Sequence, residues 1–195
     1  MGNIYCIMGK SSSGKDTIFK LLLDRTDIGL KTIVSYTTRP IRSHEKPGEE
    51  YNFVSIEEKD RLLAEGKVIE IREYNTVHGP WFYFTVDDGS LDLKHHDYLI
   101  IGTVESFVKI RDYYGEDKVL PIYIEVDDGI RLTRALEREK MQENPKYEEM
   151  CRRFLADQQD FSEENIKNAR ITNIFNNNKD SKDTCDKIAA FINGR

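Results

Sequence analysis

The sequence predicts an α/β fold in which helices cover both faces of a parallel core sheet. Apolar, strand-like runs alternate with helical stretches along the chain, and this alternation is typical of parallel sheets. The first run leads directly into a glycine-rich loop and a helix, which is a second signal of the same architecture. The expected strands are Ile4–Met8, Thr32–Val34, Tyr98–Ile101, Leu120–Val126 and Ile171–Phe175.

The glycine-rich loop Gly9–Asp16 fits the pattern G-x-x-x-x-G-K-[ST] at every position except the last. Its glycines let the backbone curl so that successive N–H groups point at phosphate oxygens. Lys15 adds a positive charge near those oxygens. The helix expected over Thr17–Leu23 presents its positive end to the same anion. The loop therefore predicts a nucleoside triphosphate ligand, and a plain Gly-Ser-rich turn is the alternative.

The last position of the loop bears on magnesium. A serine or threonine there normally lends its hydroxyl to Mg²⁺. In this chain Asp16 stands at that position and Thr17 follows one step later. The carboxylate of Asp16 could bind the metal, Thr17 could substitute, or the metal could bind elsewhere. Asp16 and Thr17 are thus the candidate magnesium ligands.

Residues 35–88 interrupt the alternation of strands and helices. This region is rich in aromatic and β-branched residues and contains short alternating runs, which predict a small antiparallel insertion. These runs are Tyr51–Val54, Val68–Glu73 and Trp81–Val86.

A second cluster of anion-binding side chains lies at the start of this insertion. Arg39 and Arg42 stand three residues apart in the segment Ser35–Arg42, with hydroxyl side chains beside them. Arginine presents a planar fork of donors that suits phosphate oxygens. Two solvent-exposed arginines in a loop are the alternative. A second anion site beside a triphosphate site implies transfer between two phosphates.

The later elements complete the predicted fold. Pro121 suggests that the fourth strand begins at an edge or a bulge. Residues 131–165 are long, charged and helical, and Pro145 marks a turn between two helices. The last helix is expected over about Asp180–Phe191, where apolar residues recur at helical spacing.

Composition narrows the class of protein. The 195 residues are enough for one domain with a real core, and 38% hydrophobic with 33% charged residues indicate a soluble, globular chain. A net charge of −6 argues against non-specific nucleic-acid binding. The three cysteines, Cys6, Cys151 and Cys185, have no spacing typical of disulfides or zinc. No apolar run approaches ~20 residues and no charged leader precedes one, so we expect no membrane partner and a cytoplasmic location.

Three motifs behind the loop resemble the guanylate kinase family, in family order. The family patterns S-x-T-T-R-x-x-R, Y-x-F-V and F-I-E are matched by Ser35–Arg42, Tyr51–Val54 and Val68–Glu70. The resemblance covers nearly the whole chain. It implies the P-loop NTPase three-layer α/β fold in a single domain, residues 1–195. The core would be about 1–34, 89–130 and 166–195, the acceptor-binding region about 35–88 and the lid about 131–165.

The resemblance also implies roles for individual residues. The acceptor monophosphate would be held by Ser35, Arg39, Arg42 and Tyr51, and Glu70 would read the guanine edge, for which a carboxylate is suited as a pure acceptor. Tyr83 would touch the acceptor phosphate and Thr85 the base. The residues expected at ATP are Gly9, Lys10, Ser11, Ser12, Ser13, Gly14, Lys15, Asp16, Thr17 and Asn176, and the catalytic residues are Lys15 and the lid arginines Arg134, Arg138 and Arg153.

The chain departs from the family pattern at two places. Phe84 stands where the family has glycine in Y-G-[ST], and glycine permits a closer backbone approach. The family pair of aspartates in L-D-[IV]-D is missing, because Gly102 and Val104 occupy those positions. Glu105 and Asp16 could supply replacement carboxylates. The departures bear on base selectivity and on the metal arrangement.

The predicted function is ATP-dependent phosphoryl transfer to a nucleoside monophosphate, with GMP as the expected acceptor and ATP with Mg²⁺ as cofactors. The partners would be small-molecule nucleotides, and the chain would be a monomer or a homodimer. Another acceptor, such as a deoxynucleoside monophosphate or a ribose bisphosphate, is an alternative. A non-catalytic guanylate-kinase-like binding module is a further alternative, although such modules typically have a degraded phosphate loop and Gly9, Gly14 and Lys15 are present.

Overall fold

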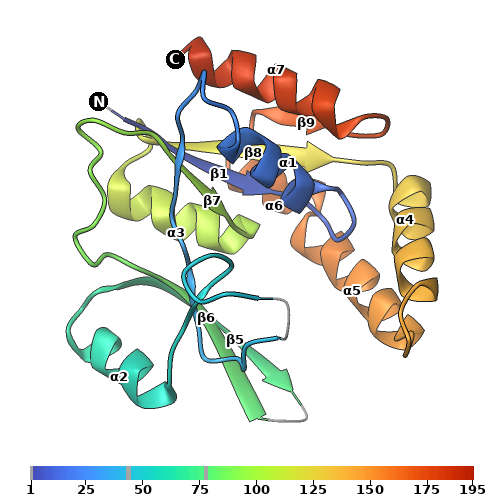
Figure 1. Cartoon of the computed structure of the whole chain (residues 1–195), viewed down its shortest axis with the longest axis horizontal. Coiled ribbons are helices and arrows are strands. Elements are labelled where there is room, and N and C mark those ends of the chain that lie inside the picture. Colours follow the sequence, from blue (N-terminus) through green and yellow to red (C-terminus); the bar gives the residue numbers. More distant parts are fainter. Residues whose placement is uncertain (1, 43–44, 77–78) are drawn as a thin grey trace.

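The core of the molecule is a five-stranded parallel sheet in the order β2-β7-β1-β8-β9 (Figure 1). The structure is a computed structural model that describes residues 2–42, 45–76 and 79–195. The strands are β1 (Ile4–Met8), β2 (Lys31–Thr32), β7 (Tyr98–Ile101), β8 (Val119–Glu125) and β9 (Ile174–Asn176).

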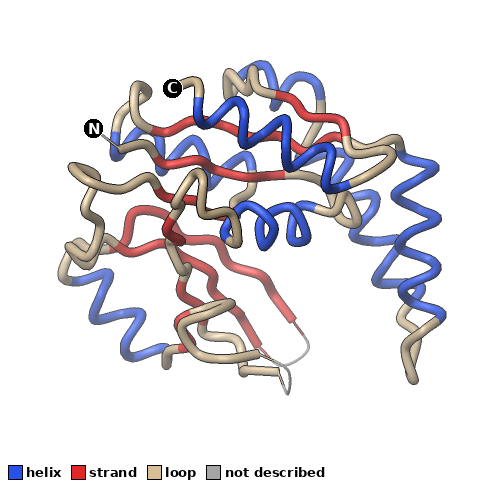
Figure 2. Tube along the Cα trace, turned by 45° about the horizontal axis from the view of Figure 1, so that its top comes forward, coloured by secondary structure: helices blue, strands red, loops and turns tan. Residues whose placement is uncertain are grey.

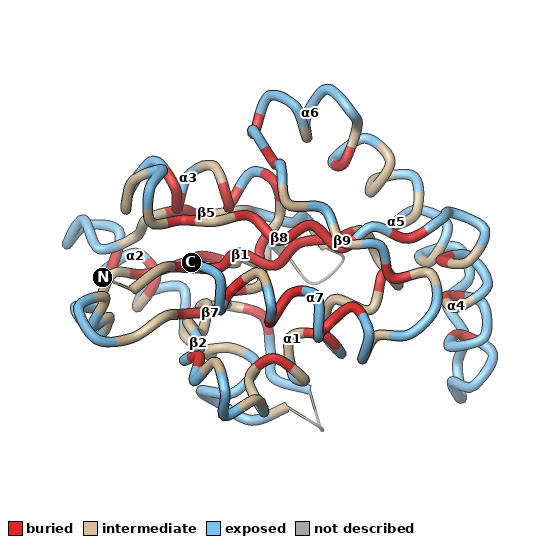
Figure 3. The backbone as a smooth tube through the Cα atoms, turned by 90° about the horizontal axis from the view of Figure 1, so that it is seen from above, coloured by how far each residue is buried: buried red, intermediate tan, exposed pale blue. Residues whose placement is uncertain are grey.

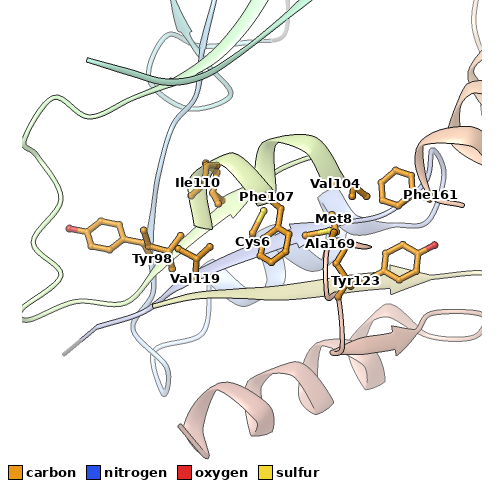
Figure 4. Close-up of a cluster of buried hydrophobic side chains, with 13 residues drawn as sticks. Cys6, Met8, Tyr98, Val104, Phe107, Ile110, Val119, Tyr123, Phe161 and Ala169 are labelled. Carbon is orange, nitrogen blue, oxygen red and sulfur yellow. The ribbon is translucent and has the colours of Figure 1, made fainter. Parts of the chain in front are cut away.

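Helices cover both faces of this sheet, and the apolar residues of β1 alternate between them. Ile4, Cys6 and Met8 pack with α3 (Val104–Tyr114) on one face, in the cluster drawn in Figure 4. Tyr5 and Ile7 pack on the other face with α1 (Lys15–Leu23) and α7 (Ser181–Asn193). Because both faces are buried, the strand reads as a continuous apolar run.

A second, four-stranded sheet projects from the core in the order β4-β3-β6-β5 (Figure 2). The strands are β3 (Tyr36–Thr37), β4 (Asn52–Phe53), β5 (Val68–Thr76) and β6 (Gly79–Val86), and α2 (Ile56–Ala64) lies beside them. Leu62 of α2 packs with Phe84 and Val86 in a separate small core. The sheet is mixed rather than wholly antiparallel, since β4 pairs with β3 in parallel.

The charged segment after β8 folds into three helices, α4 (Asp128–Lys140), α5 (Tyr147–Asp160) and α6 (Glu163–Asn168). Pro145 lies in the connection between α4 and α5, as predicted. Buried residues concentrate in β1, β7 and β8, whereas α4 and α5 are mostly exposed (Figure 3). Such a pair of helices, with little buried apolar surface, is held to the rest of the molecule chiefly by polar contacts.

Pro121 lies in the interior strand β8, at a position where the missing N–H removes no hydrogen bond to a neighbouring strand. The N–H of Tyr123, two residues on, donates to the Asn173 carbonyl on the side of β9. Pro121 therefore turns its nitrogen to the same side, where β9 does not yet pair with β8. The prediction of a local edge at the start of this strand is confirmed.

The cysteines are free, and two of them belong to the core. Cys6 and Cys185 are buried, whereas Cys151 is exposed. Burial raises the pKa of the Cys6 thiol to about 12, so this side chain is a neutral core residue. Among the described residues, no helix combines the length and apolar character needed to cross a membrane.

The backbone at Gly102 leaves no room for a side chain. A Cβ there would lie 2.7 Å from Cys6 Sγ and 2.7 Å from Ser106 Oγ. Ser106 is itself fixed, because its hydroxyl accepts from the Thr103 N–H at 2.7 Å in the cap of α3. The space that an aspartate side chain would need at position 102 is therefore filled by Cys6 and Ser106.

We expect Gly102→Ala to lower the free energy of unfolding by about 1–3 kcal/mol, because the added methyl overpacks this junction. Gly129→Ala is the matched control, since nothing lies within 4 Å of a Cβ at Gly129 in α4. The control should be neutral or slightly stabilising. Urea unfolding measures both, and equal midpoints for the two variants would contradict the packing argument.

Candidate active site

The glycine-rich loop lies between β1 and α1, at the carboxyl end of the central strand of the core. Gly14, just before α1, has a φ of +84°, a conformation that favours glycine. A Cβ at this position would also lie 2.6 Å from Asn177 Nδ2. The backbone here thus needs glycine both for its conformation and for its close neighbour.

The loop contains polar groups without a protein partner. Among the described residues, the buried hydroxyls of Ser12 and Ser13 have no hydrogen-bond partner. Lys15 begins α1, and its Nζ lies 3.6 Å from the carboxylate of Asp16. Unpaired buried hydroxyls are uncommon in native proteins unless a ligand, ion or water satisfies them. Together with the lysine and the helix N-terminus, they fit a phosphate chain.

The two candidate metal ligands are both accessible. The side chain of Asp16 is 74% exposed, and Thr17 is also exposed at the start of α1. A carboxylate and a hydroxyl are oxygen ligands of the kind that Mg²⁺ prefers. The described residues contain no cluster of three or more His, Cys, Asp or Glu side chains able to hold a metal by themselves. This donor set fits a metal that is held mainly by a nucleotide.

Asn177, not Asn176, braces the loop. The buried Asn177 side chain donates from Nδ2 to the Ser13 carbonyl at 2.8 Å and accepts from Thr184 Oγ1 at 3.2 Å. Asn176 is exposed, and within the described part of the chain its side chain accepts only from the Asn178 N–H. The predicted position was therefore one residue away from the asparagine that contacts the loop.

We expect Asn177→Ala to raise the KM for the triphosphate and to lower stability by about 1–3 kcal/mol, because the Ser13 carbonyl and Thr184 hydroxyl lose a buried partner. Asn176→Ala, which removes an exposed side chain of the same kind, is the control and should change neither quantity. Steady-state kinetics and thermal unfolding measure the two effects. Equal behaviour of the two variants would contradict the bracing role.

The α4–α5 pair contacts the loop at Ser11. The Ser11 N–H donates to Asp157 Oδ2 at 2.7 Å, and its carbonyl accepts from Arg131 Nη1 at 3.1 Å. Arg153 Nη2 donates to the Ser11 hydroxyl at 3.2 Å. Arg131 is 1% exposed and also pairs with Asp128 and Asp157. The helices after β8 are thus anchored on the tip of the loop.

The predicted loop and lid residues differ in where they point. Lys10 of the loop contacts Gln158 of α5. Arg134 donates from Nη2 to the Asn177 carbonyl at 3.0 Å, which ties α4 to the segment after β9. Arg138 is exposed, with no hydrogen bond or ion pair to any described residue. Of the three predicted lid arginines, only Arg153 reaches the loop in this structure.

The threonines of the first acceptor motif position Arg39. Thr37 Oγ1 donates to the Phe82 carbonyl at 2.9 Å and accepts from the Arg39 N–H at 3.2 Å. Thr38 Oγ1 accepts from the Phe82 N–H at 3.0 Å. Both threonines thereby fasten the segment after β3 to β6. Arg39 is consequently held beside the aromatic side chains of the second sheet.

The Arg39 guanidinium is largely occupied by Glu45, which sequence reasoning missed. Arg39 Nη2 and Nη1 donate to the two Glu45 oxygens at 2.7 and 2.8 Å, and both side chains are at least 94% buried. Arg39 Nε donates to the Tyr83 hydroxyl at 3.2 Å, and Nη1 also donates to the Pro40 carbonyl. The bidentate pairing with Arg39 lowers the pKa of Glu45 to about 2.

Two tyrosine rings complete this cluster. The rings of Tyr51 and Tyr83 lie 5.5 Å apart, edge to face, and the Arg39 guanidinium lies 5.4 Å from the Tyr51 ring. Among the described residues, no hydrogen bond, ion pair or ring contact joins the side chains of Ser35 and Arg42 to the cluster, and Arg42 is exposed. The structure therefore brings together Arg39, Tyr51 and Tyr83, and leaves Arg42 free at the edge.

Glu70 and Thr85 meet on the same face of the second sheet. Their residues are paired across β5 and β6, and Thr85 Oγ1 donates to Glu70 Oε1 at 2.7 Å. Phe84, between Tyr83 and Thr85, turns to the opposite face, where it stacks on Tyr36 at 5.5 Å. Because strand residues alternate between faces, Phe84 replaces glycine without occupying the face of Glu70.

The two clusters lie within electrostatic reach of each other. Burial raises the pKa of Tyr51, and the charge of Asp16 at the loop adds to this effect as a smaller cause. Arg39 and Arg72 act in the opposite direction on the same hydroxyl. The charge of Asp16 at the phosphate-binding loop thus acts on the Tyr51 hydroxyl of the basic, aromatic cluster, and transfer between two phosphates needs two such anion sites close together.

Comparison with known proteins finds similarity to guanylate kinases. A family model described as guanylate kinase matches residues 1–81. The chain is 36% identical over 117 residues to the guanylate kinase of Neisseria meningitidis. These aligned residues make up 59% of this chain and 55% of the relative. It is 35% identical over 124 residues to the guanylate kinase of Thermotoga maritima, and this alignment covers 64% of this chain and 49% of the relative. The matches thus span about half the length of these relatives.

A solved structure, the guanylate kinase from Anaplasma phagocytophilum, matches 99% of this chain and 85% of its own with a TM-score of 0.68. At 24% identity this likeness establishes the α/β fold. The guanylate kinase of Chlorobaculum tepidum is 30% identical over 138 residues, which cover 70% of this chain and 68% of the relative. On this extent of similarity, the chain belongs to the guanylate kinase family.

Proposed function

We propose that this protein transfers the γ-phosphoryl group of ATP to a nucleoside monophosphate, with GMP as the acceptor and GDP as the product. The observation that supports the proposal is the coexistence of two groups of side chains that are suited to bind phosphate. One is the loop with Lys15 and the unpaired hydroxyls of Ser12 and Ser13. The other is the Arg39, Tyr51 and Tyr83 cluster, next to Glu70 and Thr85.

The chemistry needs positioning and charge more than a covalent catalyst. The acceptor phosphate is already largely ionised at pH 7, since its second pKa is about 6. Lys15 lies beside the loop that cradles the β- and γ-phosphates and spreads charge off the transferring group. Arg153 reaches the loop tip from α5 and adds positive charge there. The α4–α5 pair excludes water when it closes over the reacting groups.

Asp16 and Thr17 would hold magnesium together with the nucleotide phosphates. Both are exposed at the start of α1, beside Lys15. The metal would supply neutralisation of phosphate charge. We further propose one functional domain over residues 1–195, with residues 35–88 as the acceptor-binding region and 131–165 as the lid. The monomeric or homodimeric state and the cytoplasmic location stay predictions.

Glu70 supports guanine as the acceptor base. Its carboxylate is held by Thr85 on the face that carries Tyr83, which contacts Arg39. A carboxylate only accepts hydrogen bonds, and guanine offers the adjacent N1–H and 2-amino donors. A base that lacks those donors makes fewer hydrogen bonds to this buried carboxylate and binds less tightly.

A coupled ADP-release assay across GMP, dGMP, AMP, CMP, UMP, dTMP and a ribose bisphosphate tests the proposal. We expect GMP to give the highest kcat/KM. Turnover with another acceptor but none with GMP would reject the guanylate assignment and keep the kinase class. No turnover with any acceptor, combined with ATP-independent binding of a peptide partner, would instead identify a binding module.

A further inference from the structure

A buried ion pair lies on the acceptor-binding face of the second sheet. Arg72 Nε donates to Glu70 Oε2 at 3.0 Å, and Arg72 Nη2 donates to Glu70 Oε1 at 3.3 Å. The side chain of Glu70 has no exposed surface, whereas that of Arg72 is 15% exposed. Arg72 is therefore the member of the pair that a ligand in this site can reach first.

The register of the sheet places Arg72 between the two ends of the acceptor site. Glu70 lies opposite Thr85, and Arg72 lies opposite Tyr83, so all four side chains share one face. Tyr83 contacts Arg39 at the phosphate end, and Thr85 contacts Glu70 at the base end. A monophosphate that spans the two ends must pass over Arg72.

Arg72 also has donors to spare. A guanidinium carries five N–H groups, and Glu70 is contacted by Nε and Nη2. Within residues 2–42, 45–76 and 79–195, Nη1 of Arg72 has no hydrogen-bond partner. A planar group that keeps one edge on a carboxylate can present its other edge to a ligand.

We propose that Arg72 determines base specificity by donating to O6 of the acceptor purine, beside the edge that Glu70 reads. Guanine and hypoxanthine carry an acceptor at O6 and at N7, and Arg is the side chain that most often pairs with these atoms. Adenine carries a 6-amino donor instead, which a guanidinium repels. The inference deepens the proposed function, on which it rests, and assigns the selection of a 6-oxopurine to this residue.

The competing explanation is that Arg72 only neutralises Glu70. A buried carboxylate without its counter-ion is costly, so any loss of Arg72 would then weaken all acceptors alike and destabilise the sheet. The two explanations differ in what Arg72→Lys does. Lysine keeps the charge near Glu70 but lacks the planar fork needed to serve a carboxylate and a carbonyl oxygen together.

The test is equilibrium binding of GMP, IMP and AMP by calorimetry to wild type, Arg72→Lys and Arg72→Met, with unfolding midpoints for each. We expect the Kd for GMP and for IMP to rise together by about tenfold or more in both variants, since each loses a charged hydrogen bond to O6. AMP binding should stay unchanged or become tighter. If Arg72→Met does not fold, Arg72→Lys carries the measurement.

Glu70→Gln is the matched control at the other edge of the base. It should weaken GMP more than IMP, because only GMP has the 2-amino group. Equal weakening of GMP, IMP and AMP by Arg72→Lys, or no change for GMP and IMP, would overturn the inference. These outcomes are read from binding, whereas the proposed kinase activity fails only if wild type shows no ADP release with any acceptor, so the two failures are distinguishable.

Discussion

Lys15→Ala is expected to reduce phosphoryl transfer to every acceptor by about 10²–10³-fold or more, the range seen when one preorganised charge-stabilising donor is removed. Its Nζ lies at the start of α1, and among the described residues its ion pair is with Asp16, at 3.6 Å. Its side chain is 20% exposed, and this ion pair joins neighbouring residues at the start of α1 rather than two elements of the core. The loss should therefore appear in kcat and in ATP affinity, while the free energy of unfolding changes by about 1 kcal/mol or less.

Lys20→Ala is the matched control for this prediction. Lys20 lies in the same helix and is exposed, so its substitution removes the same charge from α1 without changing the loop. Its kcat and KM should match those of wild type in the coupled ADP-release assay. Full activity of Lys15→Ala would reject the triphosphate site at the loop, and a large loss in Lys20→Ala would show that net charge on α1 matters more than position.

The sequence predicted the core strands well where they are buried on both faces. Ile4–Met8 and Tyr98–Ile101 agree with β1 and β7 in both bounds. The last strand was placed too early, because Ile171 is apolar for a different reason. It packs into the cluster of α3 and β1, and pairing with β8 starts only at Ile174. Apolar character alone cannot separate a core-packing turn residue from a strand residue.

The second sheet shows which features a local pattern does not encode. A period of two predicts strands but not the direction in which they pair, so the parallel β3–β4 pair could not be predicted from alternation. Helix α2 was missed, although a signal was present. Ser55 caps it by accepting from the Glu58 N–H, and Glu57 and Glu58 lie in its first turn.

The residues of the candidate site likewise fall into those that the local sequence predicts and those that it does not. The loop and the acceptor motifs could be predicted because their residues lie close together in the chain and carry a known chemistry. Asn177, Asp157 and Glu45 could not, since each acts through a contact that only the fold creates. Asn177 reaches Ser13, 164 residues away, and Asp157 reaches Ser11, 146 residues away. Nothing in the neighbouring sequence distinguishes them from surface residues.

Arg39→Ala is expected to have the second large effect, and on two quantities at once. The side chain of Glu45 is 6% exposed, and both of its oxygens accept from the Arg39 guanidinium, while Oε2 also accepts from the Arg42 N–H at 2.9 Å. Removing the guanidinium leaves a buried charge without its partner, which costs about 3–5 kcal/mol of stability. The Tyr83 hydroxyl loses its donor as well, so the KM for the acceptor should rise.

Arg42→Ala separates binding from stability. Arg42 is exposed and its guanidinium makes no hydrogen bond or ion pair with a described residue, so its removal should raise the acceptor KM with little change in the unfolding midpoint. Both variants are measured by GMP saturation kinetics and by urea unfolding. If Arg39→Ala is as stable as Arg42→Ala, the Arg39–Glu45 pair does not hold the acceptor region together.

The pH dependence of stability tests the same pair without disturbing Arg39. The pKa of Glu45 falls from an ordinary value of 4.5 to about 2 in the folded protein, through its pairing with Arg39. A carboxyl whose folded pKa is lowered stabilises the protein above its unfolded pKa, and this stabilisation is lost as the pH falls towards the folded pKa. The stability advantage of wild type over Glu45→Gln should therefore be full above about pH 5 and shrink as the pH approaches 2. An advantage that is independent of pH would mean that the shape of Glu45, and not its charge, fixes Arg39 in the acceptor site.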